Sequence, residues 1–162
     1  MPVGNKDEMK RTMETKIPPP IIALLHAALM YGIDQLWPQQ WLASQLALVA
    51  GVLLASPGIL LDGIGVWQFL RARTTVNPLR PQRSSALVTD GLYRISRNPM
   101  YLGMLLLLCG WSVYLANLLA LPVLGLFVLT LNRLQIQPEE RILRELFGQP
   151  YLDYCQRVRR WL

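Results

Sequence analysis

The stretch NPMYLGMLLLLCGWSVYLANLLALPVLGLFVLTLN, residues 98–132, contains no lysine or arginine and decides the fold class. A second tract without these two residue types covers 17–70. Such tracts do not form the surface of a soluble protein, whereas about 20 mainly apolar residues suffice for a helix that crosses a bilayer. Each tract is long enough for two such helices. The 162 residues therefore predict one domain with an all-α fold, a polytopic membrane helix bundle.

Short polar turns divide each tract into two expected membrane spans. In the first tract, Trp37 and Trp41 flank Pro38-Gln39-Gln40, a pattern typical of the aromatic belt at a membrane interface. The second tract divides near Asn117–Pro122. The sequence thus predicts a single membrane domain over residues 20–162, with spans at about 20–37, 41–70, 100–117 and 119–136.

The basic residues fall into three blocks that border the same predicted membrane face. The 16 lysines and arginines lie in Lys6–Lys16, Arg71–Arg97 and Arg133–Arg160. Four crossings return every block to one side, and the positive-inside rule makes that side cytoplasmic. Both termini are then cytoplasmic, 1–19 is a separate polar segment, and a bacterial or archaeal inner membrane is the expected location. Basic residues beside spans act as topology signals and contact membrane lipids, so the net charge of +6 does not indicate nucleic-acid binding.

Prolines mark the places where the helices are expected to change. Ser56-Pro57-Gly58 lies in the middle of the long second span, so a kink or a break is expected there. Gln137-Pro138-Glu139-Glu140 is expected to begin a new cytoplasmic helix, because proline favours the first helical position and acids favour the first turn. Gly148 and Pro150 then separate a second short helix. Its aromatic and apolar stripe, which suits packing on the protein or lying at the lipid headgroups, is Tyr151, Tyr154, Val158 and Trp161.

Two polar residues, His26 and Asp62, fall inside predicted spans. Such residues are costly in lipid and face the bundle interior or a cavity. Asp62 is a candidate for a direct role, with hydrogen bonding between helices as the alternative, whereas a structural role is the simpler interpretation of His26. The single histidine and the spacing of the two cysteines predict no metal site. Gly63-Ile64-Gly65 indicates close helix packing rather than a nucleotide-binding loop.

The remaining polar side chains concentrate in the connector 71–101 and in the segment 133–140. On composition alone, two interpretations stay open. The arginines are topology signals and the glutamates are acids at a helix start, or the region binds an anionic or zwitterionic cofactor whose cationic part meets Glu139 and Glu140. The members of this polar cluster are Asn77, Tyr93, Arg94, Arg97, Asn98, Tyr101, Arg133, Glu139 and Glu140.

Motifs in these segments resemble those of a known family. Leu87–Tyr93 reads L-V-T-D-G-L-Y, Arg97–Gly103 reads R-N-P-M-Y-L-G, and Glu139–Tyr154 fits E-E-x-x-L-x-x-x-F-G-x-x-Y-x-x-Y. In order and spacing they are similar to the isoprenylcysteine carboxyl methyltransferase and phospholipid methyltransferase type of integral membrane methyltransferase. The resemblance covers about 75–160, and the first two spans match only as hydrophobic helices.

The resemblance implies transfer of a methyl group from S-adenosylmethionine at the cytoplasmic membrane face. The acceptor would be a lipophilic small molecule or lipidated substrate that enters from the bilayer, with the carboxylate of an isoprenylcysteine as one option. Arg133 and Asn77 are the candidate catalytic residues. The implied cofactor-binding residues are Leu87, Val88, Tyr93, Arg97, Asn98, Pro99, Tyr101, Glu139 and Glu140.

Two positions depart from the family pattern. Asn98 stands where the pattern has histidine, and asparagine forms hydrogen bonds but cannot act as a general base. The family arginine before the acidic block aligns with Gln135, so either Arg133 replaces it or the substrate differs. The identity of the acceptor therefore stays open among prenylated cysteine, phospholipid amine, fatty acid and small thiol.

Two other functions stay open alongside the methyltransferase. Membrane sterol reductases, which use NADPH, have a similar R-N/H-P-x-Y-x-G segment and a tail similar to Tyr154–Val158. The short chain and the Glu139-Glu140 block favour the methyltransferase over this reductase. The third function is a non-catalytic membrane scaffold that retains the fold.

Overall fold

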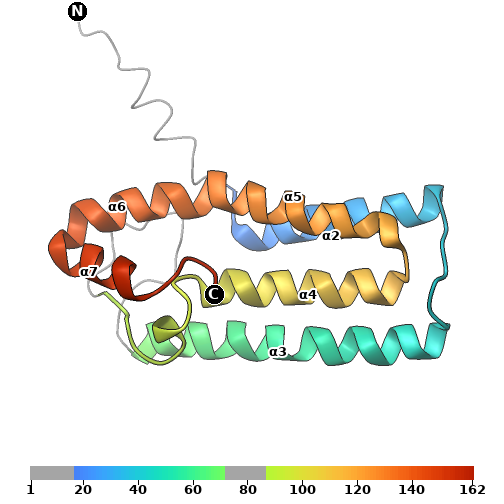
Figure 1. The fold of residues 1–162 in the computed structure, drawn as a ribbon, viewed down its shortest axis with the longest axis horizontal. Coiled ribbons are helices and arrows are strands. Elements are labelled where there is room, and N and C mark those ends of the chain that lie inside the picture. Colours follow the sequence, from blue (N-terminus) through green and yellow to red (C-terminus); the bar gives the residue numbers. More distant parts are fainter. Residues whose placement is uncertain (1–16, 72–86) are drawn as a thin grey trace, which may run out of the picture.

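The computed structural model describes residues 17–71 and 87–162, and in both ranges the regular structure is helical (Figure 1). The predicted all-α class is confirmed for this part of the chain. Most of the predicted N-terminal segment 1–19 lies outside the described residues, and so does Asn77.

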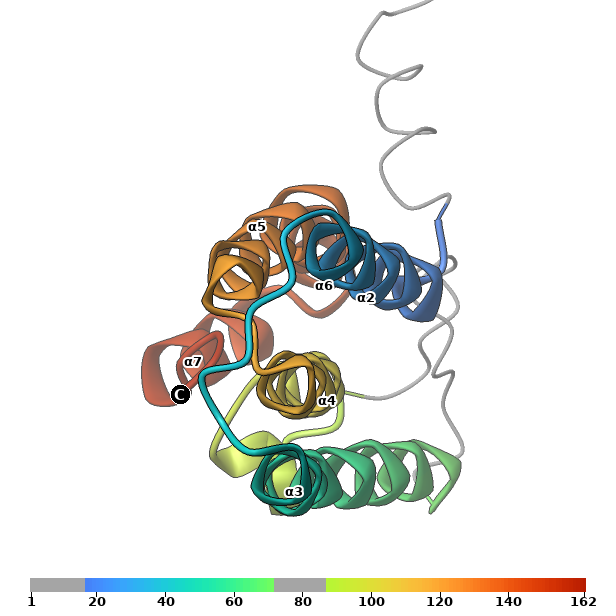
Figure 2. The same ribbon diagram turned by 90° about the vertical axis from the view of Figure 1, so that its right-hand side faces the viewer.

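Helix α4 (Pro99–Leu115) lies between α3 on one side and the pair α2 and α5 on the other (Figure 2). α2 covers Pro19–Leu36, α3 covers Ser44–Arg71 and α5 covers Leu121–Leu131. α2 packs on both α4 and α5, whereas α3 packs mainly on α4. These helices occupy nearly the ranges that the apolar tracts predict.

Glycines allow α3 and α4 to approach closely. A Cβ atom on Gly58 would lie 2.6 Å from the carbonyl oxygen of Gly103, and one on Gly51 would lie 2.8 Å from that of Gly110. Small residues at a helix interface permit this close contact in membrane proteins. The expectation of close packing at Gly63-Ile64-Gly65 is right only in part: Gly65 faces Met100, but Gly63 is exposed with no neighbour within 4 Å.

Helix α3 continues through Pro57, so the expected interruption there is not a break. Proline has no N–H group, which leaves the carbonyl of Leu53 without its helical donor. The hydroxyl of Ser56 donates to this carbonyl at 3.1 Å. Side-chain hydroxyls satisfy backbone groups that a proline leaves free in apolar surroundings, and this explains why the helix persists.

The expected helix start at Gln137-Pro138-Glu139-Glu140 is confirmed as the start of α6 (Gln137–Phe147), with Glu139 and Glu140 in its first turn, but α6 continues directly from the helix before it. The turn η3 (Leu118–Ala120), α5, the π-helical turn η4 (Asn132–Ile136) and α6 (Gln137–Phe147) form one continuous rod. In η4 the N–H of Gln137 donates to the carbonyl of Asn132, five residues earlier. This wide turn precedes Pro138 and displaces the carbonyl that the proline ring would otherwise meet.

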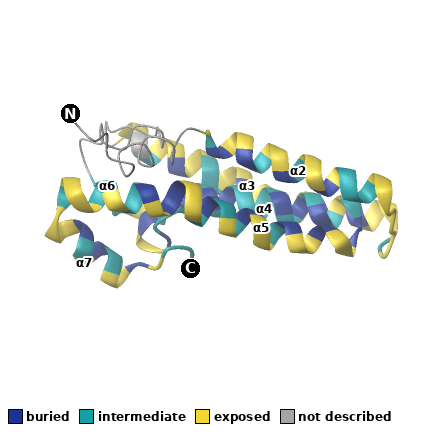
Figure 3. Ribbon diagram, turned by 90° about the horizontal axis from the view of Figure 1, so that it is seen from above, coloured by how far each residue is buried: buried dark blue, intermediate teal, exposed yellow. Residues whose placement is uncertain are grey.

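The core lies where α2, α4 and α5 meet (Figure 3). His26 is buried there: its Nδ1 donates to the carbonyl of Ile22 at 2.8 Å, and its ring meets the ring of Phe127 edge-on. At the far end of the bundle, the side chain of Asn117 donates to Asp34 at 3.0 Å and to the carbonyl of Trp37 at 2.9 Å. His26 therefore has the structural role that the sequence favoured.

Two helices, Ser44–Gln68 and Leu118–Phe147, are long and apolar enough to cross a membrane by length and composition. The apolar helix α4 is shorter. The outward surface of α3 is rich in exposed large apolar side chains, which water would solvate poorly and lipid would solvate well. They include Leu46, Leu48, Val49, Val52, Leu53, Ile59, Leu60 and Ile64.

The chain after α6 folds back onto the beginning of α4 (Figure 1). Gly148, at a positive φ of 57°, separates α6 from α7 (Gln149–Arg157). Tyr93 of η2 (Gly91–Arg94) forms a buried cluster with the α7 side, as expected for a stripe that packs on the protein. The other members of this tyrosine cluster are Tyr151, Tyr154 and Val158, flanked by Leu87, Val88, Leu143, Phe147 and Cys155.

Candidate functional site

The two glutamates of α6 reach different partners at the same end of the bundle. The Oε1 atom of Glu139 accepts a hydrogen bond from the hydroxyl of Tyr101 in α4 at 2.7 Å. Glu140 accepts two hydrogen bonds from the guanidinium of Arg160, at 3.0 and 2.7 Å. This paired geometry is the strong form of a charge-assisted contact. The α6 acids therefore join α4 and the segment after α7.

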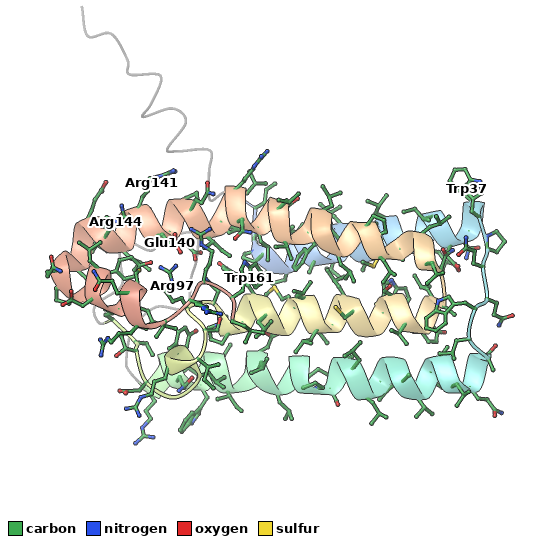
Figure 4. All side chains as sticks on the ribbon, viewed as in Figure 1. Trp37, Arg97, Glu140, Arg141, Arg144 and Trp161 are labelled. Atoms are coloured by element: carbon green, nitrogen blue, oxygen red, sulfur yellow. The ribbon has the colours of Figure 1, made fainter. Side chains whose placement is uncertain are left out.

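Arg97 lies between these elements and faces Glu140 (Figure 4). Its Nη2 atom is 3.2 Å from Oε1 of Glu140, and its Nη1 atom donates to Sγ of Cys155 at 2.6 Å. Its backbone N–H donates to the carbonyl of Arg159 at 3.0 Å. The side chain is only 15% exposed, and its Nε–H is buried with no hydrogen-bond partner. A cationic group with one donor left over is suited to an anionic ligand.

The side chain and the backbone of Asn98 are both occupied by hydrogen bonds within the fold. Its side-chain amide donates to the carbonyl of Arg160 at 2.9 Å, and its backbone N–H donates to the hydroxyl of Ser96 at 3.1 Å. Pro99, the first residue of α4, is fully buried beside it. Asn98 thus fixes the start of α4 against the 158–162 segment.

Tyr93 and Tyr154 lie buried in the same region. The hydroxyl of Tyr154 donates to the carbonyl of Tyr93 at 2.7 Å. Burial raises the pKa of both phenols, and the nearby Tyr154, Glu139 and Asp62 raise the pKa of Tyr93 further. Both side chains therefore stay protonated and keep their O–H donors over the physiological pH range.

Glu139 lies beyond the apolar part of the 118–147 helix, in the charged segment α6. Burial, opposed by the hydrogen bond from Tyr101 and aided by the charge of Glu140, raises the pKa of its carboxyl group to about 8. Desolvation disfavours the charged form of a carboxyl group unless a cation compensates it. Glu139 is therefore prepared to gain from a cationic ligand.

Helix α3 borders the region and contributes polar atoms that have no hydrogen-bond partner. Oδ1 of Asp62 is enclosed with no hydrogen-bond partner and lies against Gly103, where a Cβ would overlap it. Gln68 donates through Nε2 to the carbonyl of Asp90 at 3.1 Å, while its Oε1 is buried without a partner. Asp62, singled out from the sequence, therefore makes no hydrogen bond between helices through this oxygen.

The other predicted residues lie elsewhere or serve packing. Arg133 is exposed on η4, whereas Gln135 is buried and donates to the carbonyl of Ile17 at 2.6 Å. Leu87 and Val88 are half-buried against the tyrosine cluster. Sequence reasoning missed the roles of Ser96, Cys155 and Arg160 as contacts of Arg97, Asn98 and Glu140. No sequence signal distinguishes Arg160 from the arginines beside it.

No group of three or more His, Cys, Asp or Glu residues within 17–71 and 87–162 is arranged to hold a metal ion. A shallow surface cleft of about 310 Å³ lies on the outer side of the tyrosine cluster. Its lining consists of Thr89, Asp90, Arg94, Tyr154, Arg157 and Val158.

Comparison with known proteins identifies the family. The model of the phospholipid methyltransferase family matches residues 46–150, well over half of the chain. The chain is 31% identical to protein-S-isoprenylcysteine O-methyltransferase B of Arabidopsis thaliana over 123 residues, which cover 74% of this chain and 59% of that protein. It is 28% identical to protein-S-isoprenylcysteine O-methyltransferase of Rattus norvegicus over 142 residues, 85% of this chain and 48% of that protein.

A shorter relative and the solved structures complete the comparison. An uncharacterized protein of Haemophilus influenzae is 46% identical over 63 residues, all of its own length and 39% of this chain. No solved structure matches. The chain spans 59% and 48% of the lengths of the two methyltransferases above. The motif segments at the site fall largely within the matched region, and the chain belongs to the phospholipid methyltransferase family, whose members are S-adenosylmethionine-dependent membrane methyltransferases.

Proposed function

We propose that this protein transfers the methyl group of S-adenosylmethionine to a lipophilic acceptor at the cytoplasmic face of a membrane. The observation that carries the proposal is the convergence of Glu139, Tyr101 and Arg97, from α6, α4 and the preceding turn, on one end of the bundle. All three residues lie within the part of the chain that matches the family.

The helices support an arrangement with four spans and both termini cytoplasmic. Ser44–Trp67 of α3 extends about 35 Å at 1.5 Å per residue, close to the roughly 30 Å of a hydrocarbon core. The 30-residue rod Leu118–Phe147 is about 45 Å long by the same rise, so its charged α6 end projects beyond the core. Exposed Trp37 and Trp41 mark the opposite interface.

The residues at this end fit S-adenosylmethionine, which carries a carboxylate, an ammonium group and a sulfonium cation. Arg97, with its buried unpartnered Nε–H, would hold the carboxylate, and Glu139 would hold the ammonium group. The faces of Tyr93 and Tyr101 suit the adenine ring or the sulfonium cation. Leu87, Val88 and Pro99 supply apolar contacts, and Asn98 and Glu140 hold the surrounding segments in place.

When bound, S-adenosylmethionine supplies an electrophilic methyl carbon. Methyl transfer is an in-line displacement, so the main work of this chain is to align the acceptor and exclude water. A carboxylate or thiolate acceptor needs no base, whereas a protonated amine must first lose a proton. Asn98 cannot take that proton. Arg133, which is exposed on η4, and Asn77 are proposed as acceptor contacts.

The first test measures cofactor binding by purified protein in detergent. Glu139→Gln removes the charge that would hold the ammonium group, so the affinity for S-adenosylmethionine is expected to fall about tenfold or more, as for a lost charge-assisted contact. Glu145→Gln, on the exposed face of the same helix, is the matched control and should bind normally. Isothermal titration calorimetry gives both affinities.

The second test identifies the reaction. Membranes that contain the protein are incubated with methyl-labelled S-adenosylmethionine, and the labelled lipid-soluble product is isolated. Label that base releases indicates an ester such as a prenylcysteine methyl ester, and stable label indicates an N- or S-methyl product. Saturable NADPH binding without S-adenosylmethionine binding would support the reductase instead. Cofactor affinity that is equal in wild type and Glu139→Gln would contradict the proposed site.

A further inference from the structure

Asp62 is an ionisable residue in a helix that otherwise presents apolar side chains to its surroundings. Ile59 and Val66 lie one turn before and one turn after it on α3 and are 63% and 37% exposed. A carboxylate at this depth is costly, and such residues are retained where they contact a substrate or a partner group. The presence of a carboxylate at this position therefore requires a physical explanation.

Helix packing does not supply that reason. Oδ1 of Asp62 is enclosed and has no hydrogen-bond partner, so it does not fasten α3 to α4. Asp34, at the other end of the bundle, shows the structural alternative, since its carboxylate accepts a hydrogen bond from Asn117 at 3.0 Å. An unpaired buried carboxyl group lowers the stability of the fold unless a ligand pairs with it.

Asp62 lies on the face of α3 that meets the candidate site. Its carboxylate fills the space that the missing side chain of Gly103 leaves on α4. One turn further along α3, a Cβ on Gly65 would lie 3.9 Å from the hydroxyl of Tyr93. Both Asp62 and Glu139 raise the pKa of Tyr93, which places the two carboxylates near the same phenol, one from α3 and one from α6.

The apolar neighbours of Asp62 suggest what approaches it. A lipid chain that lies along exposed Ile59 and Val66, which share the Asp62 side of the helix, would bring its polar head to the only carboxylate of α3. Arg97, Glu139 and Tyr101, from the turn before α4, from α6 and from α4, are the groups suited to S-adenosylmethionine. Asp62 is thus left for the acceptor.

We propose that Asp62 is the acceptor-side residue of the methyl-transfer site, where its carboxylate accepts a hydrogen bond from the polar head of a lipophilic acceptor. This inference rests on the proposed methyltransferase function. A carboxylate attracts a head that carries N–H or O–H donors and repels an anionic head. Asp62 therefore acts as a positioning and specificity-determining residue.

The experiment compares wild type with Asp62→Asn and with Asp153→Asn, an exposed control on α7. Each purified protein is tested for affinity toward S-adenosylmethionine, for thermal unfolding, and for methyl transfer from labelled S-adenosylmethionine to membrane lipid extract at several extract concentrations. For Asp62→Asn we expect cofactor affinity within about twofold of wild type and an unchanged or higher unfolding temperature. Methyl transfer should fall at least about tenfold, mainly through a higher apparent KM for the extract. Asp153→Asn should match wild type throughout.

Each other outcome overturns a distinct statement. If Asp62→Asn transfers methyl groups normally, Asp62 does not position the acceptor. A lower unfolding temperature in Asp62→Asn would assign it a structural role, and a loss of cofactor affinity would move it to the donor side. Label found only in a base-labile ester of an anionic lipid would overturn the selection of donor-bearing heads. A wild type that binds no S-adenosylmethionine would instead remove the proposed function itself.

Discussion

Glu139 and Glu140 are neighbours in the sequence but occupy different electrostatic environments. Glu140 is compensated by Arg97 and Arg160, so its charge is already paired within the fold. Within residues 17–71 and 87–162, the hydrogen-bond partner of the Glu139 carboxylate is the phenol of Tyr101. Glu140 therefore stabilises the packing of the chain, and Glu139 is available for a ligand.

This difference predicts a pH dependence of cofactor binding. Because burial raises the pKa of Glu139 to about 8, the group is mainly protonated at pH 7 in the free protein. A cationic ligand favours the ionised form and lowers this pKa, so binding releases a proton. Affinity for S-adenosylmethionine should therefore increase as pH rises from about 6 to 7.5, by at most roughly tenfold per pH unit.

Calorimetry in buffers of different ionisation enthalpy measures the proton release directly. Glu139→Gln removes the titrating group and should flatten the pH profile over this range. A wild-type affinity that stays constant from pH 6 to 7.5 would show that the carboxyl group of Glu139 does not change its protonation when the cofactor binds.

The sequence indicated which residues lie together at this end of the bundle better than it indicated their contacts. Tyr101, Arg97, Glu139 and Glu140 stand out because their types and spacing are typical of a family. That Glu140 pairs with Arg160 depends on how the chain folds back after α7, and several arginines there are equivalent in sequence. Asp62 stood out in the sequence as a carboxylate within an apolar run, but only the structure shows that its Oδ1 has no hydrogen-bond partner.

At the scale of the element, the close approach of α3 and α4 depends on a few glycines. A side chain on Gly58 would meet the carbonyl of Gly103, which is backbone and cannot move independently. Asp62 lies one turn from Gly58 on the same helix, so this contact also sets how near its carboxylate lies to α4.

Gly58→Ala is therefore expected to destabilise the protein by about 1–3 kcal/mol, the usual range for overpacking an interface. Gly63→Ala, on the same helix with no neighbour within 4 Å, is the matched control. It should be neutral or stabilising by up to about 1 kcal/mol, because alanine favours a helix over glycine. Thermal unfolding in detergent compares them, and equal effects of the two substitutions would show that α3 and α4 are less closely packed.

Helix positions were predictable because long apolar runs permit little else in lipid, whereas helix junctions were not. Continuity at Pro57 depends on the hydroxyl of Ser56, and continuity at Pro138 depends on the π-helical turn η4. Both are local compensations for a missing N–H group. A rule based on proline alone predicts the loss of a helical hydrogen bond, but not the local contacts that keep the helix continuous.

At the scale of the whole molecule, the site draws on segments far apart in the sequence that meet at one end of the bundle. In the proposed site, α3 contributes Asp62, α4 contributes Tyr101 and α6 contributes Glu139, while the 158–162 segment packs on the start of α4 (Figure 1). The same end carries the charged residues of α6 and α7. The active end and the cytoplasmic end of the proposed arrangement are therefore the same.

A reporter attached after Leu162 tests this orientation in bacterial cells. Green fluorescent protein at this position should fluoresce, because it folds in the cytoplasm, whereas alkaline phosphatase should be inactive, because it requires the periplasm. The same reporters inserted between Gln39 and Gln40, in the predicted outer turn, provide the control and should give the reverse pattern. Phosphatase activity from the fusion after Leu162 would contradict the proposed cytoplasmic position of the C-terminus.

The contact between Arg97 and Glu140 also has a consequence for the order of events during synthesis. A ribosome makes Arg97 well before it makes Glu140 and Arg160, so the guanidinium reaches the membrane without its final partner. In the proposed arrangement, a cation beside α4 is repelled by the bilayer interior during that interval and favours this end of the helix on the side of synthesis. Only when α6 follows is the charge neutralised by Glu140. One arginine thus first directs insertion and later completes the folded protein.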